Sequence, residues 1–204
     1  MIYKNRFIEP TITQGQMNFL FTIRVLWRDL ATWTRAYLVN RYAGLAITED
    51  VFNRLYEIPQ EFGNILQFIF GYDNAQRFVQ YVSQQIVQIR SLIEAVIEGD
   101  VNSVNLLTQQ MYQLADERAR FMTSINPFWD LTETRNLIYT YLQLTIDQIT
   151  TLLTGDYKRN IDIFDRLLHH TDNMGDYFSQ GLLNYITYSQ HYTPTEQQQS
   201  NIQQ

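Results

Sequence analysis

Cysteine is absent from this chain of 204 residues. Disulfide bonds, thiolate nucleophiles and cysteine-ligated zinc or iron–sulfur centres are therefore excluded. Strand signals are missing too, because no run of alternating β-branched residues lies between turn signals. No Gly-x-Ser-x-Gly sequence marks a nucleophilic serine. These absences favour a helical protein and leave no recognisable nucleophilic catalyst.

Positive charge is scarce and dispersed. The chain has 15 basic and 21 acidic residues, a formal net charge of −6, and no cluster of Lys and Arg longer than a pair. A protein that binds a nucleic-acid duplex needs clustered positive charge to displace counterions. We therefore expect no nucleic-acid partner.

Long uncharged apolar segments are also missing. Residues 1–16 lack the basic region, apolar stretch and cleavage site of a signal peptide. The most apolar segment, residues 17–45, carries five charges that would be very costly in lipid: Arg24, Arg28, Asp29, Arg35 and Arg41. We expect a soluble, cytoplasmic protein with no membrane partner.

Lysine is nearly absent. Only Lys4 and Lys158 accompany 13 arginines, whereas the chain has 14 tyrosines and 21 glutamines. Ordered protein contacts favour Tyr and Arg and disfavour Lys, because the flexible, strongly hydrated Lys side chain resists immobilisation. The composition therefore fits surfaces that make close protein–protein contacts, with neutral drift in composition as the alternative explanation.

Two stretches have the apolar periodicity of an amphipathic helix, with steps of three and four residues. They span about residues 74–98 and about residues 131–154. Asp130 and Glu133 have the spacing of a capping box at the start of the second stretch. The apolar positions are Phe78, Val82, Ile86, Ile89, Ile93 and Val96 in the first, and Ile138, Leu142, Thr145, Ile149 and Leu152 in the second.

Each of these helices is followed at once by another. Only Gly99-Asp100 and Gly155-Asp156 separate the members of each pair, and connections this short imply antiparallel neighbours. A shift of 56 residues superposes the two connections and keeps the order of the landmarks around them. That order is consistent with an internal duplication of a helix pair, although the identities are no more numerous than chance gives.

The N-terminal part predicts one long helix and two short ones. Residues 19–45 are apolar on most sides, which predicts a long central helix. Thr48 is a candidate N-cap for a short helix, and Ile58-Pro59 is expected to break it before a second short helix begins.

The predicted fold class is therefore all-α. It is an antiparallel helical bundle of four to five long helices plus two short ones. Residues 1–16 form an N-terminal arm and residues 17–192 the bundle domain. Residues 193–204 form a Gln-rich tail with little to bury, which we expect to be disordered.

Several short motifs occur in an order that is typical of one protein family. They are Leu26 to Arg35, Gly99-Asp100, Ala115-Asp116, Ser124-Ile125-Asn126-Pro127-Phe128 and Gly155-Asp156-Tyr157. The Trp-Thr-Arg and Ile-Asn-Pro elements are the most specific of them. On these residues the chain resembles, over residues 26–183, an uncharacterised all-helical family of spore-forming bacteria, some members of which are labelled acetylglutamate kinase.

The kinase label finds no support in these residues. A nucleotide-phosphate site needs a Gly-rich loop at a strand–helix junction and a Lys on the phosphates. The eight glycines are scattered, and Lys4 and Lys158 lie at unsuitable places. We do not expect kinase activity.

The resemblance implies a metal site in relatives, where His from three helices and Asp from the following helices would converge in the bundle. In this sequence the three His positions correspond to Leu30, Gln85 and Tyr141, while Asp116 and Asp172 remain. None of the three can replace imidazole as a strong transition-metal ligand. We therefore expect no bound metal and no other cofactor.

The candidate metal ligands in this chain are Asp116, His169 and Asp172. On a helix, Asp165, His169, Asp172 and Asp176 follow one another at steps of four, three and four, so they share a face. The same face lies opposite an apolar stripe. A solvated polar face therefore explains it better than a metal site.

Asp29 and Arg35 are the charged residues expected to be buried in the first long helix. Desolvating either alone costs on the order of several kcal/mol, so each needs a partner. We predict a buried ion pair or hydrogen-bonded network that holds the bundle, with catalysis as the less favoured reading.

The sequence as a whole favours a non-catalytic structural or assembly protein. We expect a homo-oligomer that associates through its helical surfaces. The alternative is a small-ligand or metal-binding helical bundle with an enzymatic activity.

Overall fold

The computed structural model describes residues 13–192, with side chains described as far as Ser189. These residues form six α-helices and no strand, which confirms the all-α fold class. The helices are α1 (Gln14–Ala43), α2 (Thr48–Phe70), α3 (Tyr72–Glu98), α4 (Val101–Ile125), α5 (Leu131–Leu153) and α6 (Tyr157–Tyr192).

The first helix begins earlier than predicted. Thr13 caps it, because its hydroxyl accepts from the Gln16 amide at 3.2 Å and its own amide donates to Gln16 Oε1 at 2.9 Å. Residues 14–16 of the predicted arm therefore belong to α1. The rest of the arm before residue 13, and the predicted tail over residues 193–204, lie outside the described residues.

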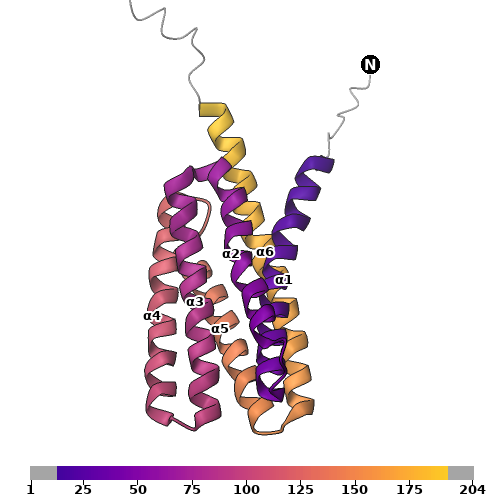
Figure 1. The fold of residues 1–204 in the computed structure, drawn as a ribbon. Helices are drawn as coiled ribbons and strands as arrows, with labels where there is room; N and C mark the ends of the chain where they lie inside the picture. The colour runs from indigo at the N-terminus through magenta and orange to yellow at the C-terminus, as the bar shows by residue number, and fades with distance from the viewer. Residues whose placement is uncertain (1–12, 193–204) are drawn as a thin grey trace, which may run out of the picture.

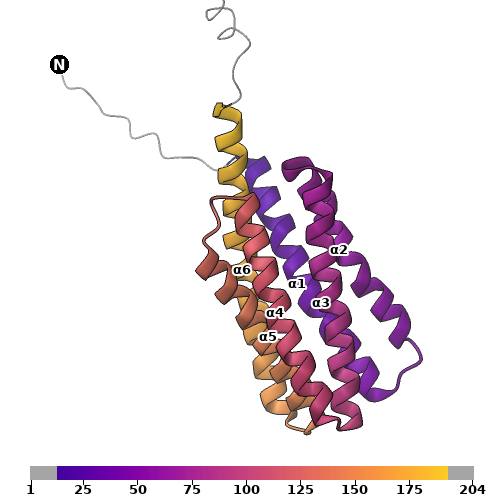
Figure 2. The same cartoon turned by 90° about the vertical axis from the view of Figure 1, so that its left-hand side faces the viewer.

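The helices form a closed ring of antiparallel neighbours (Figures 1 and 2). Each helix packs against the next along the chain, and α6 returns to pack against α1. The odd-numbered helices α1, α3 and α5 also contact one another across the ring. Side chains from these three helices therefore meet in the middle of the bundle.

Two glycine turns connect the helix pairs α3–α4 and α5–α6. Gly99 and Gly155 have φ angles of 71° and 77°, in the left-handed region that glycine adopts without penalty. In both turns the amide of the following aspartate donates to a carbonyl five residues earlier, at 2.9 Å. The predicted antiparallel pairing across these connections is confirmed.

The predicted break at Ile58-Pro59 is wrong, because α2 continues through both residues. Proline lacks an amide hydrogen, so the carbonyl of Leu55 loses its helical donor. Leu55, Ile58 and Pro59 are all buried, and Gly63 lets α2 approach α3 so closely that a Cβ there would lie 2.6 Å from Val79 Cγ2. Tertiary packing of this face outweighs the local cost of proline, and one 23-residue helix replaces two short ones.

Of the two predicted N-caps, one is confirmed and one is wrong. Asp130 is the N-cap of α5, since its carboxylate accepts from the Glu133 amide at 2.8 Å. Thr48 is not a cap, because it is the first residue of α2 and its hydroxyl donates to the Leu45 carbonyl at 2.5 Å.

Helix α1 lies against both α2 and α6, but it buries only one side. Its charges are placed at the edges: Arg24 and Arg28 pair with α6, and Arg41 donates to Glu94 of α3 at 2.5 Å. Within residues 13–192, no helix combines the length and the apolar character that crossing a bilayer requires.

Candidate functional site

Asp116 is occupied by contacts between α4 and α5. Its Oδ1 accepts from Arg135 Nε at 2.7 Å and from the Tyr139 hydroxyl at 3.0 Å. Burial and the hydrogen bond to Asp116 raise the pKa of Tyr139. The carboxylate therefore acts as a structural acceptor between two helices.

The polar face of α6 packs partly against α1. Asp172 accepts from Arg28 Nη1 at 2.7 Å, and Asp176 accepts from Arg24 Nη2 at 2.5 Å, while His169 is exposed. In the described part of the chain, no group of three or more His, Asp or Glu could hold a metal ion. Asp172 therefore links two helices, as Asp116 does, and neither is joined with His169 into a site.

Asp29 and Arg35 are half-buried rather than buried as predicted, and they do not pair with each other. Arg35 is half-buried, donates to Asn160 Oδ1 at 2.7 Å and lies over the Phe164 ring at 4.5 Å. Asp29 is also half-buried and forms no ion pair with any described residue. The helical spacing explains this: residues six apart point in different directions around a helix.

The three positions that the sequence resemblance singled out all lie in the core. Leu30 is on α1, Gln85 on α3 and Tyr141 on α5, and each side chain is at most 3 % exposed. They belong to the three helices that meet in the middle of the ring. Gln85 Nε2 and the Tyr141 hydroxyl have no hydrogen-bond partner among the described residues.

Arg118 on α4 lies beside Tyr141 and was missed by the sequence reasoning. It is 1 % exposed and is the one charged residue among those described that is fully buried. Its Nε and both Nη atoms lack a hydrogen-bond partner within residues 13–192. The signal was present, because Met111, Ala115, Arg118 and Met122 follow one another at steps of four, three and four.

Burial shifts the titration of both groups. It lowers the pKa of Arg118 to about 10, against an opposing effect of the Tyr141 hydroxyl, so the guanidinium stays protonated at neutral pH. It raises the pKa of Tyr141 to about 12, so that hydroxyl stays neutral. Thr34 and Thr145 lie close enough to oppose this second shift, but their own hydroxyls donate to helix carbonyls.

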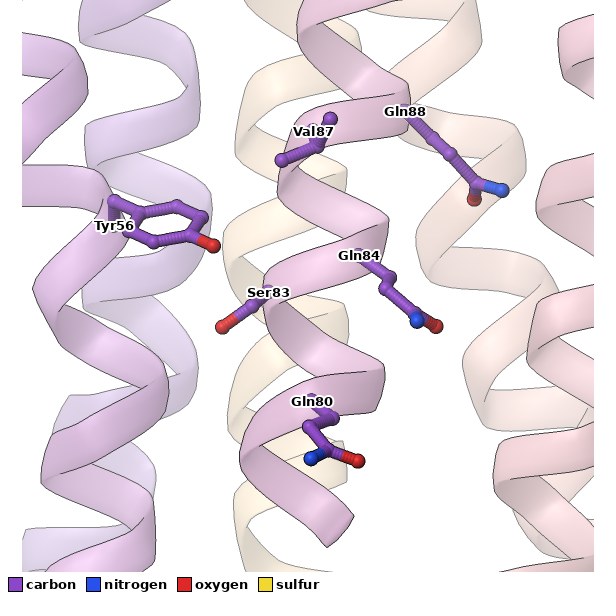
Figure 3. Close-up of a pocket in the computed structure, with 6 residues that line it drawn as sticks. All are labelled: Tyr56, Gln80, Ser83, Gln84, Val87 and Gln88. Atoms are coloured by element: carbon purple, nitrogen blue, oxygen red, sulfur yellow. The ribbon is translucent and has the colours of Figure 1, made fainter. Parts of the chain in front are cut away.

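An open groove of about 520 Å³ lies on the surface between α2 and α3 (Figure 3). The Tyr56 ring points across it from α2, and the α3 side is lined by Gln80, Ser83, Gln84, Val87 and Gln88. None of these side chains is charged or a strong nucleophile. The groove therefore offers hydrogen bonds but no catalytic chemistry.

The side of α1 that faces away from the bundle carries exposed apolar side chains among polar ones such as Asn18, Thr22 and Thr32. We call it the outer face of α1; its apolar side chains are each between 36 % and 52 % exposed: Met17, Phe21, Val25, Val39 and Tyr42. The exposed side of α6 between Lys158 and Gln180 is polar except for Ile161. A contiguous apolar patch of about a few hundred Å² or more marks an interaction site on most soluble proteins.

Comparison of the chain with protein-family models, with curated proteins and with solved structures gives no match.

Proposed function

We propose that this chain is a non-catalytic structural protein that assembles with copies of itself through the outer face of α1. The observation that carries the proposal is the set of exposed apolar side chains on one face of α1. Phe21 and Val25 stand one turn apart and are each 52 % exposed. The abundance of Arg, Tyr and Gln with almost no Lys supports it, because this composition suits ordered contacts.

We take a second copy as the partner, because exposed apolar side chains lie towards both ends of α1. The midpoint of these side chains along α1 lies between Arg28 and Thr32. A twofold axis there would bring Phe21 of one copy against Val39 of the other, which is the self-complementary pairing of closed dimers. Arg28, the charge within the face, already pairs with Asp172, so two copies would not oppose unpaired like charges.

The alternative function is that of a small-ligand-binding bundle. One observation favours it, namely the unpaired buried guanidinium of Arg118. It concerns the interior of the bundle and is independent of the outer face of α1.

Sedimentation velocity over a range of concentrations tests the proposal. The full chain and a chain that ends at Tyr192 should both associate, because neither needs the Gln-rich tail. The double substitution Phe21→Gln with Val25→Gln should raise the dissociation constant about tenfold or more, since burying each apolar side chain contributes roughly 1 kcal/mol or more. Leu106→Gln is the matched control, because Leu106 on α4 is 55 % exposed and lies outside this face.

Three results would contradict the proposal. A full chain that stays monomeric at all concentrations removes the assembly itself. Association lost with the tail alone assigns the contacts to residues 193–204. An effect of Leu106→Gln as large as that of the double substitution shows that general surface hydrophobicity is responsible.

A further inference from the structure

The interior of the bundle contains a positive charge that no described protein group neutralises. Arg118 is protonated at neutral pH, fully buried, and lacks a partner for any of its three nitrogens. A guanidinium carries five N–H donors and no acceptor. Leaving such a charge unpaired in a low-dielectric interior is far more costly than pairing it.

The neighbouring carboxylate does not serve as its counterion. Asp116 is two residues away on the same helix, so it points to a different side of α4. It already accepts from Arg135 and Tyr139. Among the described residues, the one titratable group that acts on Arg118 is the Tyr141 hydroxyl, which is neutral.

Two further buried polar atoms at this level of the bundle can also donate. Among the described residues, neither the Tyr141 hydroxyl nor Gln85 Nε2 has a hydrogen-bond partner. Gln85 and Arg118 lie at the same level of the helix pair α3–α4. The ring centroids of Tyr81 on α3 and Phe121 on α4 are 5.5 Å apart. Gln85 follows Tyr81 by about one turn and Arg118 precedes Phe121 by about one turn, so both lie about one turn nearer the α3–α4 connection than these rings. Hydroxyl and amide donors therefore lie at the level of a guanidinium without an anionic acceptor.

We propose that Arg118 and Tyr141 bind a small monovalent oxyanion, of the carboxylate or nitrate type, in the centre of the bundle. A planar oxyanion presents two acceptor oxygens in the geometry of the guanidinium fork, and it supplies the missing negative charge. The Tyr141 hydroxyl would donate to it, with Gln85 as a further donor. The ligand must be small, because the surrounding side chains are almost fully buried.

Formate is the probe that tests this site. The full chain is dialysed free of small anions, and sodium formate is titrated against its thermal unfolding midpoint. Ionic strength is held constant with the sodium salt of a bulky sulfonate. We expect a saturable rise of about 5–10 °C at a hundredfold excess over the dissociation constant. Arg118→Met, which keeps the volume and removes the charge, should abolish the saturable rise.

A second variant keeps the test decisive where Arg118→Met does not fold. Tyr141→Phe removes one donor and leaves the ring in place, so the formate concentration at half-saturation should rise about tenfold. Carbon-13 NMR of labelled formate measures binding without unfolding. The proposal is overturned where the wild-type chain shows no saturable response, or where Arg118→Met or Tyr141→Phe responds as the wild type does. Loss of self-association on the outer face of α1 would leave these results unchanged.

Discussion

Arg35 shows at the scale of one residue how a charge is held in the first helix. Its guanidinium bonds the buried Asn160 and covers the Phe164 ring. Arg35→Ala should therefore lower the free energy of unfolding by about 1–2 kcal/mol, through the lost charged hydrogen bond and the lost cation–π contact. Chemical denaturation measures the change.

Arg159→Ala is the matched control, because Arg159 is exposed on the first turn of α6. It should change stability by less than about 0.5 kcal/mol. Equal stabilities of the two variants would contradict the anchoring role of Arg35.

His170 gives the stability a specific pH dependence. Its ring Nε2 lies 2.7 Å from the Leu137 carbonyl, and burial lowers its pKa below the ordinary value of 6.5. Between the folded-state pKa of His170 and 6.5, the unfolded chain binds more protons than the folded chain. The contribution of His170 to the free energy of unfolding is therefore fully present above pH 6.5 and falls as the pH drops below 6.5. The slope is a fraction of the roughly 1.4 kcal/mol per pH unit that one proton can give, since the ring is half-exposed.

Denaturation of His170→Gln between pH 7 and pH 5 measures this contribution. The variant should lose part of the pH dependence. The exposed neighbour provides the control, and His169→Gln should behave as the wild type does. A wild-type slope retained in His170→Gln would show that other groups are responsible.

The buried residues also show which polar positions could be predicted. The cost of desolvation predicts that Arg35 needs a partner. The sequence does not identify that partner, because Asn160 lies 125 residues away on a helix that only the fold brings near. Arg118 could have been found from its place in an apolar stripe, but its missing counterion is visible only in the packed bundle.

At the scale of helices, close approach of α1 and α6 depends on one glycine. A Cβ on Gly175 would lie 2.7 Å from the Arg24 Cα, which is too near for contact without a shift of the backbone. Gly175→Ala should therefore cost about 1–3 kcal/mol, although alanine is favoured over glycine in a helix.

Gly15→Ala, at the start of α1, should have the opposite effect on stability. A Cβ there meets nothing nearer than the Thr13 hydroxyl at 4.0 Å, so the substitution should stabilise by about 0.4–1 kcal/mol. Thermal unfolding of both variants should give shifts of opposite sign. Stabilisation by both would show that α1 can move away from α6 without cost.

Most helices were predictable because local signals agreed with packing. The apolar stripes of α3 and α5 and the two glycine turns set their bounds to within two residues. The exception is α2, where Pro59 is a strong local signal for a break. The helix continues through Pro59 because Leu55 and Ile58 are buried and Gly63 packs closely against α3. Neither the burial nor the contact can be recognised in a short window of sequence.

At the scale of the whole molecule, the sequence shows the excess of apolar residues in the first helix. It does not show which side of that helix is left exposed. The ring of helices covers one side of α1 and leaves Phe21 and Val25 outside. Local periodicity could not tell which side, because residues 19–45 are apolar on most sides.

Disulfide cross-linking tests most directly whether two copies meet at the outer face of α1. The chain has no cysteine, so a single introduced cysteine can bridge only to its copy. Two such residues form a disulfide when their Cβ atoms lie about 3.5–4.5 Å apart. Thr32→Cys, near the proposed twofold axis, should give a cross-linked dimer on mild oxidation, and faster than Val39→Cys.

Gln109→Cys, on the exposed side of α4, is the matched control. It should cross-link only as fast as molecules collide at random. That rate rises with protein concentration and does not depend on a specific dimer contact. We expect rapid dimer formation for Thr32→Cys and little for Gln109→Cys. Equal rates for the two variants, or a faster reaction of Gln109→Cys, would contradict it.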